Sequence, residues 1–157
     1  MLNEFVAKKL GEVLAFAAVG IETFEKGKSA LVSVLREDVV KDFIQKCESH
    51  RSKILEIAEN QVISDVVLKK LDGTGTKLRS MRDLYVGDQW ENPTELLEWS
   101  GFFEGAALVH WSLVKGAGET TNHQEVINLA QDATTLHQEI FDKAVKLLHQ
   151  VGKTKSK

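Results

Sequence analysis

The sequence predicts an all-helical fold, a four-helix bundle, and three observations support this. Four long segments place apolar residues at steps of three and four, and no convincing run alternates between polar and apolar residues. The chain of 157 residues contains one proline, which argues against a turn-rich β-sandwich. Its length suits one sizeable core. We therefore expect residues 1–151 to form a single helical-bundle domain, followed by a basic, disordered tail at 152–157.

The first helix is expected from about Leu2 to Lys26, where Gly27 provides a plausible cap. Apolar residues recur along one stripe of this segment, and its middle, VLAFAAVGI, is apolar all round. Such a pattern is typical of a helix that is covered on more than one side. The stretch is too short to cross a bilayer, which takes about 20 residues, and it lacks the flanks of a signal peptide. No membrane association is expected.

The second helix is expected to begin between Ser29 and Asp38 and to continue to about Leu71. Taken from Asp38, it would be roughly 50 Å long at 1.5 Å per residue. The sequence DGTGT at Asp72–Thr76 then predicts a break, because two glycines alternate with short polar side chains. A connector should follow to about Glu91. Connectors of this length usually cross over a fold or serve a site.

The third helix has the clearest start in the chain. Asn92 can cap it, Pro93 suits the first helical position, and Glu95 completes a capping box. It should run to about Lys115 and end at the Gly-Ala-Gly sequence of residues 116–118.

The fourth helix is expected from near Asn122 to about Val151. Short joins link the first helix to the second and the third to the fourth. An extended connector of about 20 residues, at 3.3 Å per residue, could span the whole bundle. The two middle helices would then be parallel, as in ferritin-like folds, or antiparallel with an ordered excursion.

The net charge and the cysteine content of the chain argue against several classes of function. The formal net charge of −3 leaves no basic excess, so dedicated nucleic-acid binding is disfavoured. Cys47 is the only cysteine, which excludes an internal disulfide and a cluster of thiolate metal ligands. A reducing, cytoplasmic environment is the simplest expectation.

Four residues are candidates for ligand binding. Glu104 lies inside the apolar run GFFEGAALVHW, and a buried carboxylate must be paired, protonated or bound to a metal. His110, His50 and His137 fall on the inward-leaning faces of three different helices. Together the four would suit a metal or a polar ligand, since neutral imidazole is a common metal ligand. The alternative is that each histidine only bonds a neighbouring carboxylate. The sequence identifies neither a metal nor a cofactor, and both stay unknown.

In its four long helices and its long middle connector, the chain resembles the ferritin-like bundles over most of its length. The di-iron members need a Glu-x-x-His pair on each of two helices. No Glu in this sequence is followed three residues later by His, and His-Glu-x-x-His is also missing. The resemblance therefore implies a fold without the oxidase chemistry, and we assign no catalytic residues.

Association is the leading functional hypothesis. Between Gly101 and Val109 the third helix is apolar on nearly all sides and contains Phe102 and Phe103, more than one bundle face can cover. We expect a cytoplasmic homo-oligomer, most simply a homodimer with a possible protein partner, that acts without catalysis. The alternative is a metal- or small-ligand-binding bundle with a polar Glu/His pocket. A third hypothesis is a thiol sensor in which His50 activates Cys47.

Overall fold

A computed structural model describes the whole chain, residues 1–157. The fold is all-helical and contains no strand. The six helices are α1 (Glu4–Lys26), α2 (Lys28–Val32), α3 (Glu37–Asn60), α4 (Ser64–Val86), α5 (Pro93–Thr120) and α6 (Gln124–Lys155). The buried apolar residues form one continuous cluster to which every helix contributes. No helix has both the length and the apolar character needed to cross a membrane.

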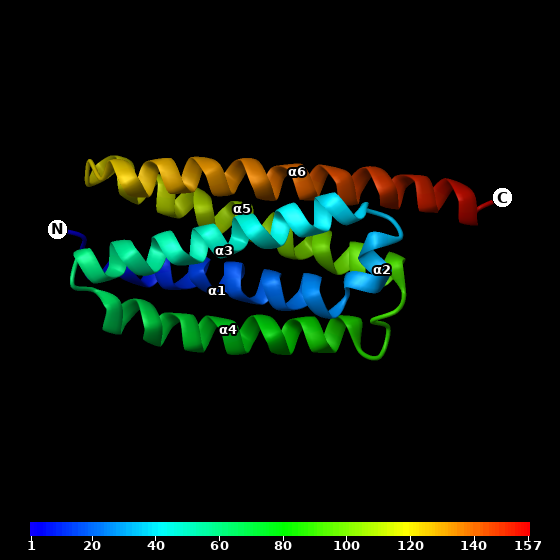
Figure 1. Ribbon diagram of the computed structural model, residues 1–157, viewed down its shortest axis with the longest axis horizontal. Helices are drawn as coiled ribbons and strands as arrows, with labels where there is room; N and C mark the ends of the chain where they lie inside the picture. Colours follow the sequence, from blue (N-terminus) through cyan, green and yellow to red (C-terminus); the bar gives the residue numbers. More distant parts are fainter.

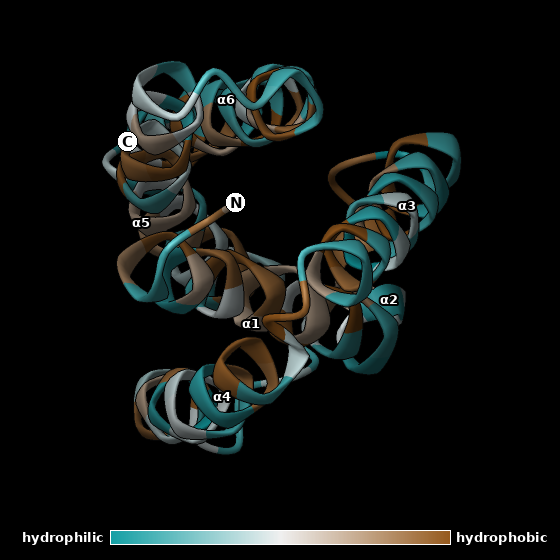
Figure 2. Ribbon diagram, turned by 90° about the vertical axis from the view of Figure 1, so that its left-hand side faces the viewer, coloured by the Kyte–Doolittle hydropathy of each residue, from teal (hydrophilic) through white to brown (hydrophobic).

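The core lies among α1, α3, α5 and α6, and α4 packs outside it against α1 (Figures 1 and 2). The helix α1 contacts α3, α4 and α5, which explains why its middle is apolar all round. In Figure 1, α1, α4 and α6 run in one direction along the long axis, and α3 and α5 run in the other. The short helix α2 lies at the end of the molecule where α1 passes to α3.

The predicted second helix is two helices in the structure, so that expectation was wrong. The segment from Asp38 to Leu71 turns at residues 61–63, between α3 and α4. At this turn Val62 has a φ of 57°, a left-handed conformation that β-branched residues rarely adopt. The Ile63 amide donates to the Ala58 carbonyl across it at 2.9 Å, and Gln61 Oε1 accepts from the Leu2 amide at 3.1 Å.

The predicted break at Asp72–Thr76 is also wrong, because these residues lie in the middle of α4. The Thr76 hydroxyl donates to the Asp72 carbonyl at 2.9 Å, a bond made within the helix. Helix α4, and not an extended connector, therefore carries the chain back along the molecule from the end of α3 to the start of α5 (Figure 1). As a result α3 and α5 are parallel.

Close contact with α1 holds α4 in place. A Cβ built on Gly11 would lie 2.6 Å from the Val67 carbonyl oxygen, so only glycine lets the two backbones approach this closely. Further along, Arg79 forms an ion pair at 2.8 Å with Glu22 of α1, and Arg82 reaches the same carboxylate at 3.5 Å. Packing on α1 explains how a glycine-containing segment stays helical.

The start of α5 is as predicted in its cap, since Asn92 Oδ1 accepts from the amides of Thr94 and Glu95. The second half of the predicted capping box is not formed, because the Asn92 amide donates to the Gln89 carbonyl at 3.0 Å. Its end is different, because the helix continues through the Gly-Ala-Gly sequence to Thr120. Helix α6 begins at Gln124, close to the predicted start near Asn122, and its cap is His123. The last helix extends past Val151 to Lys155, so the basic tail begins as an exposed helical extension.

Candidate functional site

A buried ionisable pair lies at the centre of the fold. Glu104 of α5 is 0% exposed and His137 of α6 is 1% exposed, and the His137 Nδ1 and Glu104 Oε2 atoms share a hydrogen bond. The apolar run around Glu104 packs it into the core, where a lone carboxylate would be too costly. His137 is the partner that the sequence required but did not identify.

Unsatisfied polar atoms surround this pair. The Glu104 Oε1, His50 Nδ1 and Trp111 Nε1 atoms are buried and have no hydrogen-bond partner. The His50 ring lies 6.5 Å from the His137 ring and 6.0 Å from that of Trp111, measured between centroids. We name Glu104, His137, His50 and Trp111 the core polar cluster. Unsatisfied buried polar groups are uncommon in folded proteins, which makes the cluster a candidate site; Trp99 Nε1 and Ser100 Oγ are also unsatisfied but lie outside it.

Burial keeps His50 neutral. Removal of the ring from water, together with the nearby His137 ring, lowers the pKa of His50 from 6.5 to about 4. The negative charge of Asp132 opposes this shift and raises the pKa. A neutral imidazole has one donor and one acceptor nitrogen, and it can bond to either kind of group.

His110 does not belong to this cluster. Its Nδ1 atom lies 3.0 Å from Glu12 Oε2 of α1, and its ring packs on Phe16 at 5.0 Å between centroids. Phe16 contacts Phe103 as well, at 5.0 Å. The four predicted ligand residues thus form two groups: Glu104, His137 and His50 come together in the core, and His110 lies apart at the α1–α5 surface.

Glu12, the partner of His110, was not predicted from the sequence. It is 7% exposed and accepts hydrogen bonds from Lys9, at 3.1 and 3.2 Å, besides its contact with His110. Lys70 of α4 lies 3.5 Å away. Burial raises the pKa of this carboxyl, but the hydrogen bonds and charges of Lys9 and His110 outweigh burial and lower it overall.

The core polar cluster does not form a metal centre in this arrangement. No group of three or more His, Cys, Asp or Glu side chains in the structure is placed to hold a metal ion. Cys47 is fully buried, and both burial and the negative charge of Glu104 raise the pKa of its thiol well above the ordinary value. A thiol of this kind is inert, which argues against the thiol-sensor hypothesis.

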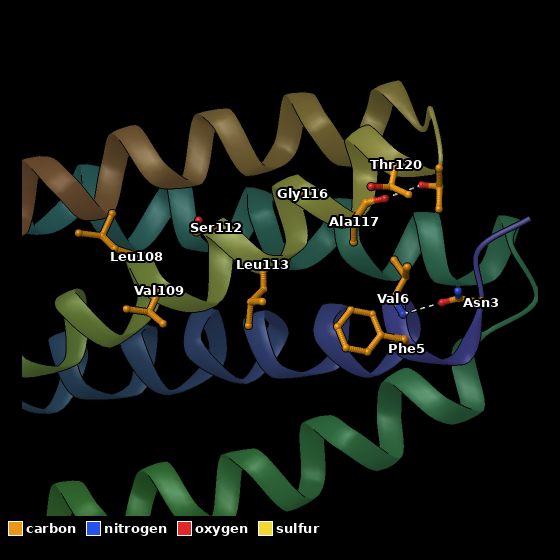
Figure 3. A pocket seen from close by; sticks show the side chains of 11 residues that line it. Asn3, Phe5, Val6, Leu108, Val109, Ser112, Leu113, Gly116, Ala117 and Thr120 are labelled. Atoms are coloured by element: carbon orange, nitrogen blue, oxygen red, sulfur yellow. Dashed lines mark hydrogen bonds between the residues drawn. The ribbon is translucent and has the colours of Figure 1, made fainter.

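A second candidate site is an apolar groove of about 970 Å³ between the N-terminal part of α1 and the C-terminal half of α5 (Figure 3). We name it the α1–α5 groove. Phe5, Val109 and Leu113 line it and are 53%, 63% and 44% exposed. None of its lining residues is charged: Asn3, Phe5, Val6, Leu108, Val109, Ser112, Leu113, Gly116, Ala117, Thr120 and Thr121.

Small side chains leave the backbone of α5 accessible inside the groove. Ser112, Gly116 and Thr120 follow one another at steps of four and so share one face of the helix. A Cβ built on Gly116 would meet no atom within 4 Å. The groove therefore has room for another helix at close range.

A third hollow lies between α3 and α6. It is polar, has a volume of about 250 Å³, and is lined in part by His50.

Comparison of the chain with protein-family models, with curated proteins and with solved structures gives no match. Inferences about function therefore rest on the geometry and chemistry of the sites themselves.

Proposed function

We propose that the protein acts by self-association, with two copies packing along the α1–α5 groove. The observation that carries this proposal is the complete lack of charge among the lining residues, in a chain of which 27% of the residues are charged. Interface cores are depleted in charge and enriched in aromatic and apolar side chains. An exposed apolar surface of this kind is typical of a protein–protein contact site.

The shape of the groove favours a second copy as the occupant. Val109 and Leu113 project from α5, and the small residues Ser112 and Gly116 lie beside them on the same helix. A two-fold axis across α5 would place the projecting residues of each copy over the small residues of the other. Such self-complementarity is what an isologous dimer requires, and close approach at small residues lets helix ridges pack into grooves.

Three variants test the proposal by light scattering during size-exclusion chromatography at micromolar concentration. Leu113→Glu adds a charge to the groove, and Gly116→Leu fills it at a position where an added Cβ meets no atom within 4 Å. Both variants should be monomeric. The matched control is Leu84→Glu on α4, which changes a residue that is 87% exposed and outside the groove, and it should remain dimeric.

The proposal fails if Leu113→Glu and Gly116→Leu have the same mass as the unmodified protein while circular dichroism shows that both are folded. A heterologous protein partner in the groove would give a monomer for the unmodified chain and for all three variants.

The proposal includes a cytoplasmic location, because the single cysteine suits a reducing compartment.

The second candidate function is binding of a small ligand in the core, within a ferritin-like bundle; a metal would require Glu104, His50 and His137 to rearrange, because as placed they do not form a metal centre. The free Glu104 Oε1 and His50 Nδ1 atoms favour it, since both retain unused hydrogen-bonding capacity. The parallel arrangement of α3 and α5, joined by a long crossing, also suits that architecture. Elemental analysis of the purified protein tests it: no bound metal, and no rise in Tm on adding iron, zinc or manganese, would remove the metal version.

A further inference from the structure

The hollow between α3 and α6 has the composition of a binding pocket for a charged small molecule. We name it the α3–α6 pocket; only one of its eight lining residues is hydrophobic. Its volume of about 250 Å³ lies below the 300–1,000 Å³ of pockets for drug-sized ligands, so it suits a small metabolite. It shares no residue with the α1–α5 groove, and the inference below does not rest on self-association.

Opposite charges face each other across this pocket. Lys46 and Lys53 lie seven residues apart on α3, which puts both on the pocket side of that helix. Asp132 and Glu139 have the same spacing on α6. Lys46 forms its only ion pair with Asp42 of its own helix, at 3.0 Å, and no ion pair joins α3 to α6 across the pocket.

A buried and unpartnered side chain lies at the inner side of the pocket. His50 lines it and is only 5% exposed, and its buried Nδ1 atom has no hydrogen-bond partner. Buried polar side chains almost always have a partner. His50 therefore adds a polar side chain to the inner wall of the pocket, beyond the surface charges, and it links the pocket to the core polar cluster, whose His137 ring is 6.5 Å away.

We propose that the α3–α6 pocket binds a small zwitterion of the amino-acid class, with a carboxylate near Lys46 and Lys53 and an ammonium group near Asp132 and Glu139. The two positive and two negative side chains balance, and His50 is neutral, so the pocket has no net preference for a simple anion or a simple cation. A ligand that bears both charges satisfies both sides at once. His50 then bonds a polar atom of the ligand that enters deepest.

The test is a titration of the isotopically labelled protein followed by nuclear magnetic resonance, with the His50 ring and the Thr135 amide as reporters. The probes are glycine and a mixture of the proteinogenic L-amino acids. Acetate, which has only the carboxylate, and methylammonium, which has only the ammonium group, serve as ligand controls. We expect the amino acids to shift both reporters in a saturable way, and each half-molecule to bind about tenfold more weakly or worse.

Variants on the two sides of the pocket complete the test. Lys53→Gln and Asp132→Asn change exposed residues and should not affect folding, yet each should weaken amino-acid binding about tenfold. Lys69→Gln on the exposed face of α4 is the matched control and should bind normally. Reporter shifts with acetate as strong as with glycine would overturn the proposal in favour of an anion site. The absence of shifts with every amino acid would show that the facing charges serve only the packing of α3 against α6.

Discussion

Replacing Gly73 by alanine tests the part of the fold that differs most from the sequence prediction. Gly73 lies inside α4, and a Cβ built there would meet nothing within 4 Å. Alanine is favoured over glycine in a helix interior by about 1 kcal/mol. The Gly73→Ala variant should therefore raise the free energy of unfolding by about 1 kcal/mol.

Gly11→Ala makes the same chemical change in α1, where the structure predicts no gain in stability or a loss. The new Cβ would lie 2.6 Å from the Val67 carbonyl oxygen and 2.6 Å from Lys70 Cβ. A backbone oxygen cannot move without α4, and overpacking of this kind costs about 1–3 kcal/mol. This cost cancels or exceeds the gain in helix propensity, so the two variants should differ by about 1–3 kcal/mol.

Urea unfolding, followed by circular dichroism at one fixed protein concentration, measures both changes. The denaturant slope should stay constant, which shows that only stability has changed. A neutral or destabilising Gly73→Ala would mean that residues 72–76 form the loop that their sequence indicates. If Gly11→Ala stabilised the protein as much as Gly73→Ala, α4 would not pack against α1 as described.

The remaining predictions concern the core polar cluster and its neighbour Cys47. Glu104→Ala should lower the free energy of unfolding by about 3–5 kcal/mol, because it leaves His137 buried without its partner. Glu104→Gln should lower the free energy of unfolding by less. If urea unfolding shows equal losses for the two variants, the pairing of Glu104 with His137 is refuted. The pKa of His50 falls from 6.5 to about 4 on folding, so the unfolded chain binds the extra proton. The free energy of unfolding should therefore decrease by up to about 3 kcal/mol as the pH falls from 6.5 to 4. His50→Gln should remove this contribution to the pH dependence of stability. A His50→Gln variant with the same pH dependence as the unmodified protein would contradict the prediction. Cys47 should resist iodoacetamide in the folded protein and react once urea unfolds it; rapid labelling without urea would show that it is accessible.

The helix class and the start of α5 could be predicted because both depend on local signals. Asn92, Pro93 and Glu95 form a capping pattern that is readable without any knowledge of the fold. The turn between α3 and α4 carries no such signal. Its left-handed residue is Val62, where glycine or asparagine would have been expected.

The glycines of α4 misled the prediction for a different reason. Two glycines and short polar side chains favour a turn when the segment is considered alone. In the protein the segment is held against α1, and the ion pair of Arg79 with Glu22 adds to that contact. Tertiary packing thus outweighs a local propensity of about 1 kcal/mol per glycine.

The candidate site was predictable in its residue types but only partly in its geometry. Helical spacing indicated that Glu104, His50 and His137 turn inward, and the three do come together. The same spacing could not show that His110 turns to Glu12, because these residues lie 98 positions apart in the chain. The rotation of each helix about its axis relative to the others decides such contacts, and it is set by packing.

Sedimentation equilibrium of the unmodified protein over a series of micromolar concentrations tests self-association most directly. If two copies pack along the α1–α5 groove, the weight-average mass should rise with concentration toward twice the chain mass of 17.5 kDa. A mass that stays at 17.5 kDa up to about 100 µM, where even a Kd of that size would leave dimer visible, would contradict the proposal.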